Sequence, residues 1–199
     1  MGLEVKHSFL ICAFPRSRTM WLARFLSVPG VSVCTHEATE FAGSAAEFWR
    51  NADGTAETFG VPVYGNSDSA NIFVLPALLA ERPLTKVIWI ARPIVKVAKS
   101  MKAAKMPFTE QSARTLMVMR DAHKDHFDAV IPFDHLERMD VCRWIWEYCL
   151  PGVPFDAGRW GLFHSKKIGY SAANPPPLKP YAKFLAFVQR EIGQPDYAT

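Results

Sequence analysis

The feature that most constrains this chain is the alternation of short apolar runs with segments of helical periodicity. Apolar runs at 8–14, 86–91 and 129–133 have the length of buried strands, and each precedes a segment whose apolar residues recur at helical spacing. Strands that alternate with helices pair in parallel, because each helix returns the chain to the same edge of the sheet. The pattern predicts an α/β fold of three layers, with a parallel sheet flanked by helices in a single domain.

Turn and breaker residues divide the rest of the chain. We expect two further strands at 31–35 and 61–64, a helix over 42–50 followed by a turn, and helices over 71–81, 93–104, 109–126, 134–149 and about 179–192. The triple proline makes an extended linker of 172–180. With 199 residues, 49% of them hydrophobic, the chain has enough apolar surface for one core, and we treat 1–199 as one domain with this linker and a terminal helix at about 172–199.

Composition bears on the cellular compartment of the protein and on the class of its ligand. The four cysteines form no CxxC pair, and Cys12 and Cys34 lie in strand-like runs, which indicates reduced, buried thiols. We see neither a leader of the secretory type nor an apolar stretch that would span a membrane, and we predict a cytoplasmic protein. A net charge of +4 suits an anionic small ligand or nucleic acid equally, but no clustered basic and aromatic surface favours nucleic acid.

The most informative segment runs from the first apolar strand through Pro15–Thr19 into a helix. The first turn of a helix exposes unpaired backbone N–H groups and the positive end of a dipole, and together they bind anions. Ser17 and Thr19 add hydroxyls, and Arg16 and Arg18 add charge. The segment lacks GxxxxGK[ST], which argues against an ordinary ATP- or GTP-dependent kinase. By itself it is also compatible with a plain capped helix.

A second candidate phosphate segment follows the apolar strand 86–91. Arg92 stands at the carboxyl end of this strand, where ligands bind in open α/β sheets, and Ser100 follows eight residues later on the next helix. A guanidinium recognises phosphate with two N–H groups, and the serine adds another donor. Lys96 and Lys99 are interpreted as a solvated helix face.

These two segments resemble the phosphate-binding segments of the sulfotransferases. PRSRTMWL is similar to the family's 5′-phosphosulfate loop, roughly P-(K/R)-S-G-T-T-W-L, and the spacing of Arg92 and Ser100 is that of its 3′-phosphate segment. Arg18 replaces the usual Gly, which would strain the backbone if this position has a positive φ, and Met20 replaces the second Thr. The matching positions of the loop are Pro15, Arg16, Ser17, Thr19, Trp21 and Leu22.

The resemblance implies a P-loop-type fold and a sulfotransferase that uses PAPS (3′-phosphoadenosine 5′-phosphosulfate), releases PAP (adenosine 3′,5′-bisphosphate) and requires no metal. Arg16 would stabilise the charge on the leaving phosphate, and Trp21 would stack on adenine. Arg92 and Ser100 would bind the 3′-phosphate. The 5′ side would be held by Ser17, Arg18, Thr19, Met20 and Trp21. The family's C-terminal KGxxGxWK-type loop is missing, and Lys166 or Lys167 could replace it, but the missing loop also leaves open that catalysis has been lost.

Transfer to a hydroxyl or amine needs a general base. The stretch THEATEF follows the predicted second strand and resembles the region in which several sulfotransferases carry a catalytic Glu. Glu37 is the first candidate, His36 the second and Glu40 the third, and an ordinary loop with a capped helix start is the alternative. Ser67, Asp68 and Ser69 could contact the ligands, or they could form an Asx turn and helix cap.

Several questions stay open at this level. The acceptor could be a small molecule or a saccharide, and the oligomeric state could include a homodimer. Rival functions are a P-loop kinase for a small metabolite and a non-catalytic nucleotide-binding protein of sulfotransferase ancestry. We also expect Asp134 to cap a helix, Trp144 to be core and Trp146 to be surface, and His123 and His126 to be solvated rather than metal ligands. An apolar acceptor pocket could draw on Phe41, Phe48, Trp49, Met106 and Phe108.

Overall fold

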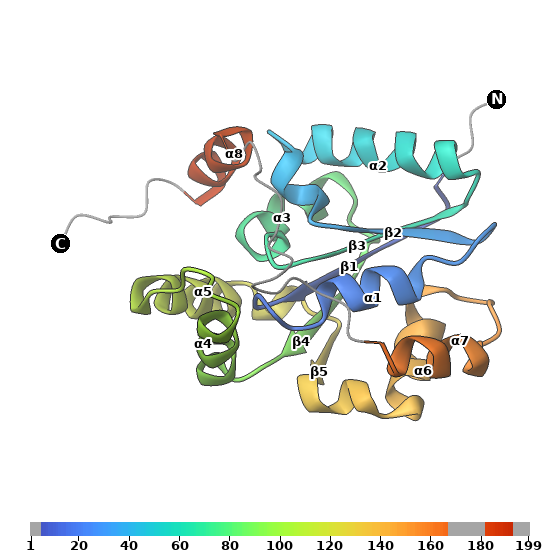
Figure 1. The fold of residues 1–199 in the computed structure, drawn as a ribbon. Helices are drawn as coiled ribbons and strands as arrows, with labels where there is room; N and C mark the ends of the chain where they lie inside the picture. The colour runs from blue at the N-terminus through green and yellow to red at the C-terminus, as the bar shows by residue number, and fades with distance from the viewer. Residues whose placement is uncertain (1–4, 167–181, 193–199) are drawn as a thin grey trace.

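A five-stranded parallel sheet with the order β2-β3-β1-β4-β5 forms the centre of the computed structural model (Figure 1). The structure describes residues 5–166 and 182–192. The α/β fold with a parallel sheet is therefore confirmed. The strands are β1 (His7–Ala13), β2 (Ser32–His36), β3 (Val63–Asp68), β4 (Lys86–Ala91) and β5 (Ala129–Pro132).

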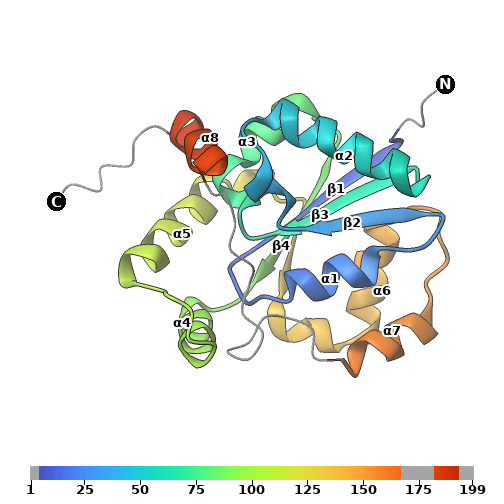
Figure 2. The ribbon, with the colours of Figure 1, turned by 45° about the horizontal axis from the view of Figure 1, so that its top comes forward.

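Helices cover both faces of this sheet, and Figure 2 shows the two layers from a second direction. One layer consists of α1 (Thr19–Leu26), α6 (Met139–Cys149) and α7 (Ala157–His164). The other layer contains α2 (Ala45–Phe59), α3 (Asn71–Glu81), α4 (Ile94–Ala103), α5 (Glu110–Ala122) and α8 (Ala182–Ile192). Short 3₁₀ turns are η1 (Ala38–Phe41), η2 (Lys124–His126) and η3 (Phe133–Glu137).

The central strand β1 divides the apolar core into two halves. Successive side chains of a strand point to opposite faces, and β1 is apolar on both. Leu10 and Cys12 pack under the α2 and α3 layer, whereas Phe9 and Ile11 pack under α1 and α6. Burial on both faces explains why this strand reads as a continuous apolar run in the sequence.

Strand β3 is the strand whose extent differs most from the sequence-based prediction. We expected a short strand at 61–64 followed by a polar loop, but the strand extends to Asp68 and all six of its residues are buried. Gly65 is required by packing, because a Cβ atom there would lie 2.1 Å from the Phe9 ring. Asn66 is tolerated in this strand because it hydrogen-bonds to Thr35, Thr39 and Asn71. Asp68 accepts a hydrogen bond from the backbone N–H of Ala70.

Helix α2 continues through the segment 51–55, which we expected to be a turn. Its apolar stripe does not stop there, because Ala52 and Ala56 are buried on the same face as Phe48 and Trp49. The helix ends at Gly60, whose φ of 62° is the left-handed conformation typical of a helix C-terminus.

Helix α6 packs a different face against the core from the one we expected. Trp146 is 1% exposed and Trp144 is 41% exposed, so our assignment of these two rings to surface and core was wrong. The buried positions Cys142, Ile145, Trp146 and Cys149 follow helical spacing. Asp134 does not cap this helix but lies in η3, where it forms an ion pair with Lys96 at 2.8 Å.

The strand order creates a crevice at one edge of the sheet. Strands β1 and β4 are neighbours, yet the chain leaves β1 toward β2 on one side and leaves β4 toward β5 on the other. Connections that diverge in this way leave a space beyond the carboxyl ends of the strands, where ligands of open α/β proteins bind. Both segments singled out in the sequence begin here.

Candidate functional site

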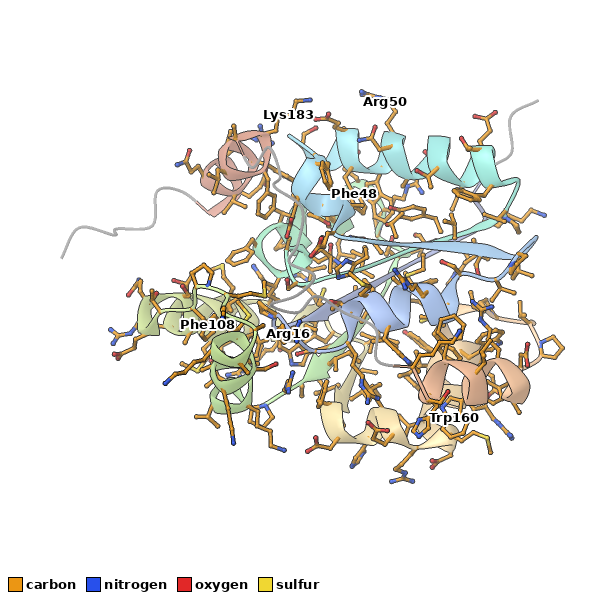
Figure 3. All side chains as sticks on the ribbon, viewed as in Figure 1. Arg16, Phe48, Arg50, Phe108, Trp160 and Lys183 are labelled. Carbon is orange, nitrogen blue, oxygen red and sulfur yellow. The ribbon has the colours of Figure 1, made fainter. Side chains whose placement is uncertain are left out.

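A cavity of about 290 Å³ lies at this edge of the sheet, and we call it the carboxyl-edge cavity. The chain segments after β1, β2, β3 and β4 all reach it. The structure therefore brings together residues from every site segment named above, and Figure 3 shows Arg16 at the start of the loop into α1. The lining residues are Pro15, Arg16, Arg18, Thr19, Met20, His36, Glu37, Ser69, Arg92, Ser100 and Met106.

The two candidate phosphate segments touch each other directly. Arg16 Nε donates a hydrogen bond of 3.3 Å to Ser100 Oγ, across 84 positions of the sequence. One terminal nitrogen of Arg92 donates to the carbonyl oxygen of Arg16. The loop after β1 and the strand end of β4 thus form one wall of guanidinium and hydroxyl groups.

Arg92 has a guanidinium nitrogen that is left unpaired among the described residues. Its guanidinium lies 4.2 Å from the centre of the Phe133 ring, and its Nε is buried with no hydrogen-bond partner in the described part of the chain. Burial lowers the pKa of Arg92 first, and the neighbouring charge of Arg16 lowers it further. A buried cation beside a second cation is an unfavourable pair that a bound phosphate would relieve.

The loop itself holds two residues in the left-handed conformation. Arg16 has φ 64° and Arg18 has φ 62°, and Arg18 occupies the position just before α1. The concern about a non-glycine residue at this position is therefore justified, because an L side chain in this region costs roughly 1–2 kcal/mol. The Arg18 guanidinium forms an ion pair with Glu137, which holds the side chain against η3.

Ser17 is the buried residue of the loop. Its side chain is fully buried, and Oγ has no hydrogen-bond partner among the described residues. A buried hydroxyl without a partner is destabilising, so its presence in a loop of cations needs an explanation. Arg16 and Arg18 on either side of it line the cavity.

The candidate bases lie at the opposite side of the cavity from β4. His36 Nε2 is hydrogen-bonded to Thr19 Oγ1 at 3.0 Å, and His36 Nδ1 lies 3.6 Å from Glu37 Oε2. Both side chains are mostly buried, at 16% and 18% exposure. Glu37 has φ 64°, so the backbone turns sharply at this residue. Glu40 does not line this cavity but a second one beside it.

A buried polar network fixes the segment that carries these bases, and the sequence did not reveal it. Asn66 Nδ2 donates to Thr39 Oγ1 and to Asn71 Oδ1, each at 2.8 Å, and Thr39 in turn donates to Asn71. Thr35 Oγ1 donates to Asn66 Oδ1 at 3.0 Å. Each member is hydrogen-bonded to at least one other, and a buried network of this kind makes the backbone rigid. A polar run after an apolar strand start was its only signal.

One expectation needs correction, and one open alternative is confirmed. Trp21 is 2% exposed, stacks on Phe25 in the core, and its Nε1 donates to the carbonyl of Phe163 at 2.8 Å. Its ring therefore faces the core, not the cavity, which contradicts a stacking role on adenine. Asp68 accepts a hydrogen bond from the backbone N–H of Ala70 at 2.9 Å, which confirms the Asx-turn alternative.

Other expectations concern features away from the cavity. All four cysteines are free and buried, as predicted. In the ranges 5–166 and 182–192, no group of three or more His, Cys, Asp and Glu side chains could hold a metal ion. No helix in those ranges is long and apolar enough to cross a membrane. Lys166 is exposed, and Lys167 and the proline-rich linker lie outside the described residues.

Comparisons with known proteins add little beyond the fold. No family model matches this sequence, and no curated protein matches it. Among solved structures, mouse sulfotransferase SULT7A1 complexed with PAP is similar at 15% sequence identity, with 100% of this chain and 81% of that chain covered and a TM-score of 0.49. A likeness this distant decides nothing about the site, which rests on the contacts above.

Proposed function

We propose that this chain is a PAPS-dependent sulfotransferase. The observation that carries the proposal is the meeting of two phosphate-type segments, through Arg16, Ser100 and Arg92, at a cavity whose other side holds Glu37 and His36. Each segment alone is common in proteins. Their contact at the crevice beyond β1 and β4 is what an anionic nucleotide needs.

The residues present fit such a ligand. Arg92 Nε and Ser17 Oγ are buried polar groups without partners among the described residues, and both are donors that an anion would satisfy. Cavities for small molecules measure about 300–1,000 Å³. The 290 Å³ of the carboxyl-edge cavity therefore suits the charged groups of PAPS, with the remainder of the ligand outside it.

Sulfuryl transfer from PAPS forms a bond between the acceptor oxygen or nitrogen and sulfur, breaks the bond from sulfur to the 5′-phosphate oxygen, and leaves the electron pair on PAP. Arg16 would hold the leaving phosphate, and the first-turn N–H groups of α1 would add to it. Thr19 and the backbone of Ser17, Arg18 and Met20 would complete the 5′ side, and Arg92 with Ser100 would hold the 3′-phosphate.

Glu37 is the proposed base. Both ring nitrogens of His36 are engaged, one by Thr19 and one by Glu37, so His36 is better placed to orient Glu37 than to accept the proton itself. Glu37 would accept the proton from the acceptor hydroxyl or amine as the new bond to sulfur forms.

The decisive test is a thermal shift with PAP, compared with ATP–Mg²⁺ and AMP. A ligand that binds the folded state raises the melting temperature by mass action, so no acceptor is needed. We expect PAP to raise it for the wild type and for Lys99→Ala, an exposed position on α4, but not for Arg92→Ala.

Other results would replace the proposal. A response to ATP–Mg²⁺ but not to PAP would favour a kinase. PAP binding without release of PAP from PAPS would favour a non-catalytic nucleotide-binding protein. If Arg92→Ala responds to PAP like the wild type, the assignment of the 3′-phosphate site is wrong.

A further inference from the structure

A second cavity, of about 420 Å³, opens beside the carboxyl-edge cavity, and we call it the apolar cavity. The two share Pro15 and Ser69 as lining residues, so they adjoin at the loops after β1 and β3. The walls of the apolar cavity come from α3, α5, α8 and the segment before α5, where Figure 3 shows Phe108.

The lining of this cavity is mostly apolar, and its polar side chains are those of Glu40, Ser69, Gln111, Ser112 and Thr115. Aromatic rings stand on three sides, from Phe73 of α3, Phe108 before α5 and Phe184 of α8, and Leu116 and Val188 fill in between. Glu40 is the one charged residue in the described lining, and no Lys or Arg contributes. The residues differ from those we expected, because Phe48 and Trp49 are core, Met106 lines the carboxyl-edge cavity and only Phe108 belongs here.

Helix α8 is a fixed wall, although it lies far from the other walls in the sequence. Its Lys183 pairs with Glu47 at 3.2 Å, and Arg190 donates to the carbonyl of Gly43 at 3.0 Å. Both contacts lie at the start of α2. Phe187 is fully buried beneath the helix, and the Phe184 ring packs edge-on against Phe73 at 6.5 Å. The apolar face of α8 is therefore held in place over the cavity.

We infer that the acceptor of the proposed transfer is an apolar small molecule with a terminal hydroxyl, not a saccharide. The inference rests on the proposed function. An apolar body would bury its surface between the rings, which is favourable in proportion to the area removed from water. A saccharide carries hydroxyls on all sides, and those that faced Phe73, Phe108 and Phe184 would be buried without hydrogen-bond partners, which is unfavourable.

The residues shared by the two cavities place the reacting end of such an acceptor. A hydroxyl at the end of the molecule that meets Pro15 and Ser69 would enter the cavity lined by Glu37 and Arg16. The remainder of the acceptor would stay between α3, α5 and α8. Acceptor choice would then be set by α5 and α8, while the phosphate segments would only bind the nucleotide.

The test measures binding of three probes to the protein saturated with PAP, by isothermal titration calorimetry. The probes are 2-naphthol, 1-octanol and N-acetylglucosamine. Thr115→Trp places a large ring into the cavity, and Val118→Trp is the matched control on the same helix, where Val118 is 55% exposed outside the cavity. Leu185→Asp is a second variant, because Leu185 lines the cavity yet is 54% exposed and tolerates change.

We expect at least one of the apolar alcohols to bind, with at least tenfold weaker binding in Thr115→Trp and Leu185→Asp and wild-type binding in Val118→Trp. The inference is overturned if neither alcohol binds, if N-acetylglucosamine binds more tightly, or if both cavity variants bind like the wild type. The melting-temperature response to PAP is recorded separately for every variant. If PAP does not raise the melting temperature of the wild type, the proposed function is wrong. The binding data for the alcohols would then still show which class of molecule the apolar cavity binds.

Discussion

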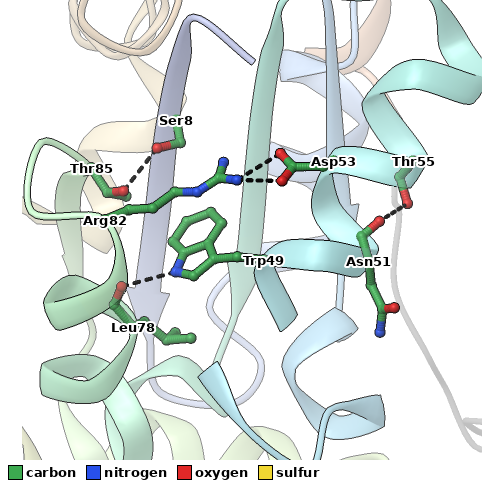
Figure 4. Close-up of polar contacts among 8 residues, drawn as sticks. All are labelled: Ser8, Trp49, Asn51, Asp53, Thr55, Leu78, Arg82 and Thr85. Atoms are coloured by element: carbon green, nitrogen blue, oxygen red, sulfur yellow. Dashed lines mark hydrogen bonds and ion pairs between the residues drawn. The ribbon is translucent and has the colours of Figure 1, made fainter. Parts of the chain in front are cut away.

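The two edges of the sheet carry cavities of opposite character. The amino-edge cavity, which lies beside the starts of β1 and β4, measures about 710 Å³, against 290 Å³ for the carboxyl-edge cavity. In the larger one the charged groups are paired (Figure 4): one Arg82 nitrogen donates to both Asp53 oxygens at 2.6 Å, and Ser8 and Thr85 share a hydrogen bond of 2.8 Å. Each cavity has one lining nitrogen that is buried without a partner among the described residues, His7 Nε2 in the larger and Arg92 Nε in the smaller, but only Arg92 is a permanent cation.

The difference shows that unsatisfied charge, not volume, identifies the candidate site. Arg82 also lies 4.5 Å from the centre of the Trp49 ring. Its guanidinium therefore contacts both a carboxylate and an aromatic ring of the protein. Arg92 has a ring beneath it as well, but the acceptor it contacts is a carbonyl oxygen, and a second cation lies beside it. Buried polar groups are normally paired, so the leftover Arg92 donor is where an anion could bind.

The largest expected difference between the two cavities comes from neutralising one carboxylate in each. Glu37→Gln should lower the rate of PAP release from PAPS in the presence of 2-naphthol by about 10²–10⁴-fold, because a general base contributes that much. Asp53→Asn should leave this rate unchanged. The assay is labelled-PAPS turnover, with the PAP-induced melting shift as the check on binding. Equal rates for Glu37→Gln and the wild type would make His36 the first candidate for the base.

Arg82→Ala is the converse of the Arg92→Ala test. Removal of Arg82 should lower the free energy of unfolding by about 1–2 kcal/mol, since a partly exposed ion pair, a ring contact and the packing of its stem are lost together. Urea denaturation measures this loss. The melting shift with PAP should stay at the wild-type size. A smaller PAP shift in Arg82→Ala would mean that the two edges are not independent.

The strain in the loop after β1 can be isolated with two substitutions at Arg18. Arg18→Gly and Arg18→Ala both lose the ion pair with Glu137, and only Ala keeps a Cβ atom at φ 62°. We expect the Gly variant to be more stable than the Ala variant by about 1 kcal/mol. Equal urea midpoints would show that the loop relaxes out of the left-handed conformation when the Glu137 contact is absent.

The smallest effect concerns His7 at the amino-edge cavity. Burial lowers the pKa of His7 below 6.5, with Lys86 as a lesser cause, so the unfolded chain binds a proton that the folded chain excludes. Stability should therefore fall as the pH drops below 6.5, and His7→Gln should reduce that fall. His123, whose pKa burial also lowers, adds to it with the same sign. Urea denaturation at pH 7 and pH 5 measures the fall in the free energy of unfolding. An identical fall in His7→Gln and the wild type would exclude His7 as a cause of the pH dependence.

The regular parts of the fold could be read from the sequence because they depend on local pattern. The ranges expected for β4 and α3 coincide with the observed ones, since each is an apolar segment bounded by breakers. The same patterns placed Arg92 at a strand end and Ser17 in a turn before a helix. Of the ten proposed site residues, all but Ser17 and Trp21 line the carboxyl-edge cavity.

Contacts between residues far apart in the sequence determined the parts of the fold and the candidate site that we did not predict. Trp21 and Trp146 face the core because α1 and α6 pack against each other and the sheet, and an apolar stripe cannot tell which ring that packing will cover. The polar strand β3 exists because Asn66 and Asn71 find partners in Thr39 and Thr35. Local pattern was enough to locate the candidate phosphate donors and the candidate base along the chain. The contact of Arg16 with Ser100 and the position of α8 beside an apolar cavity could be known only from the folded chain, because burial and hydrogen bonding between distant segments follow from packing and not from local pattern.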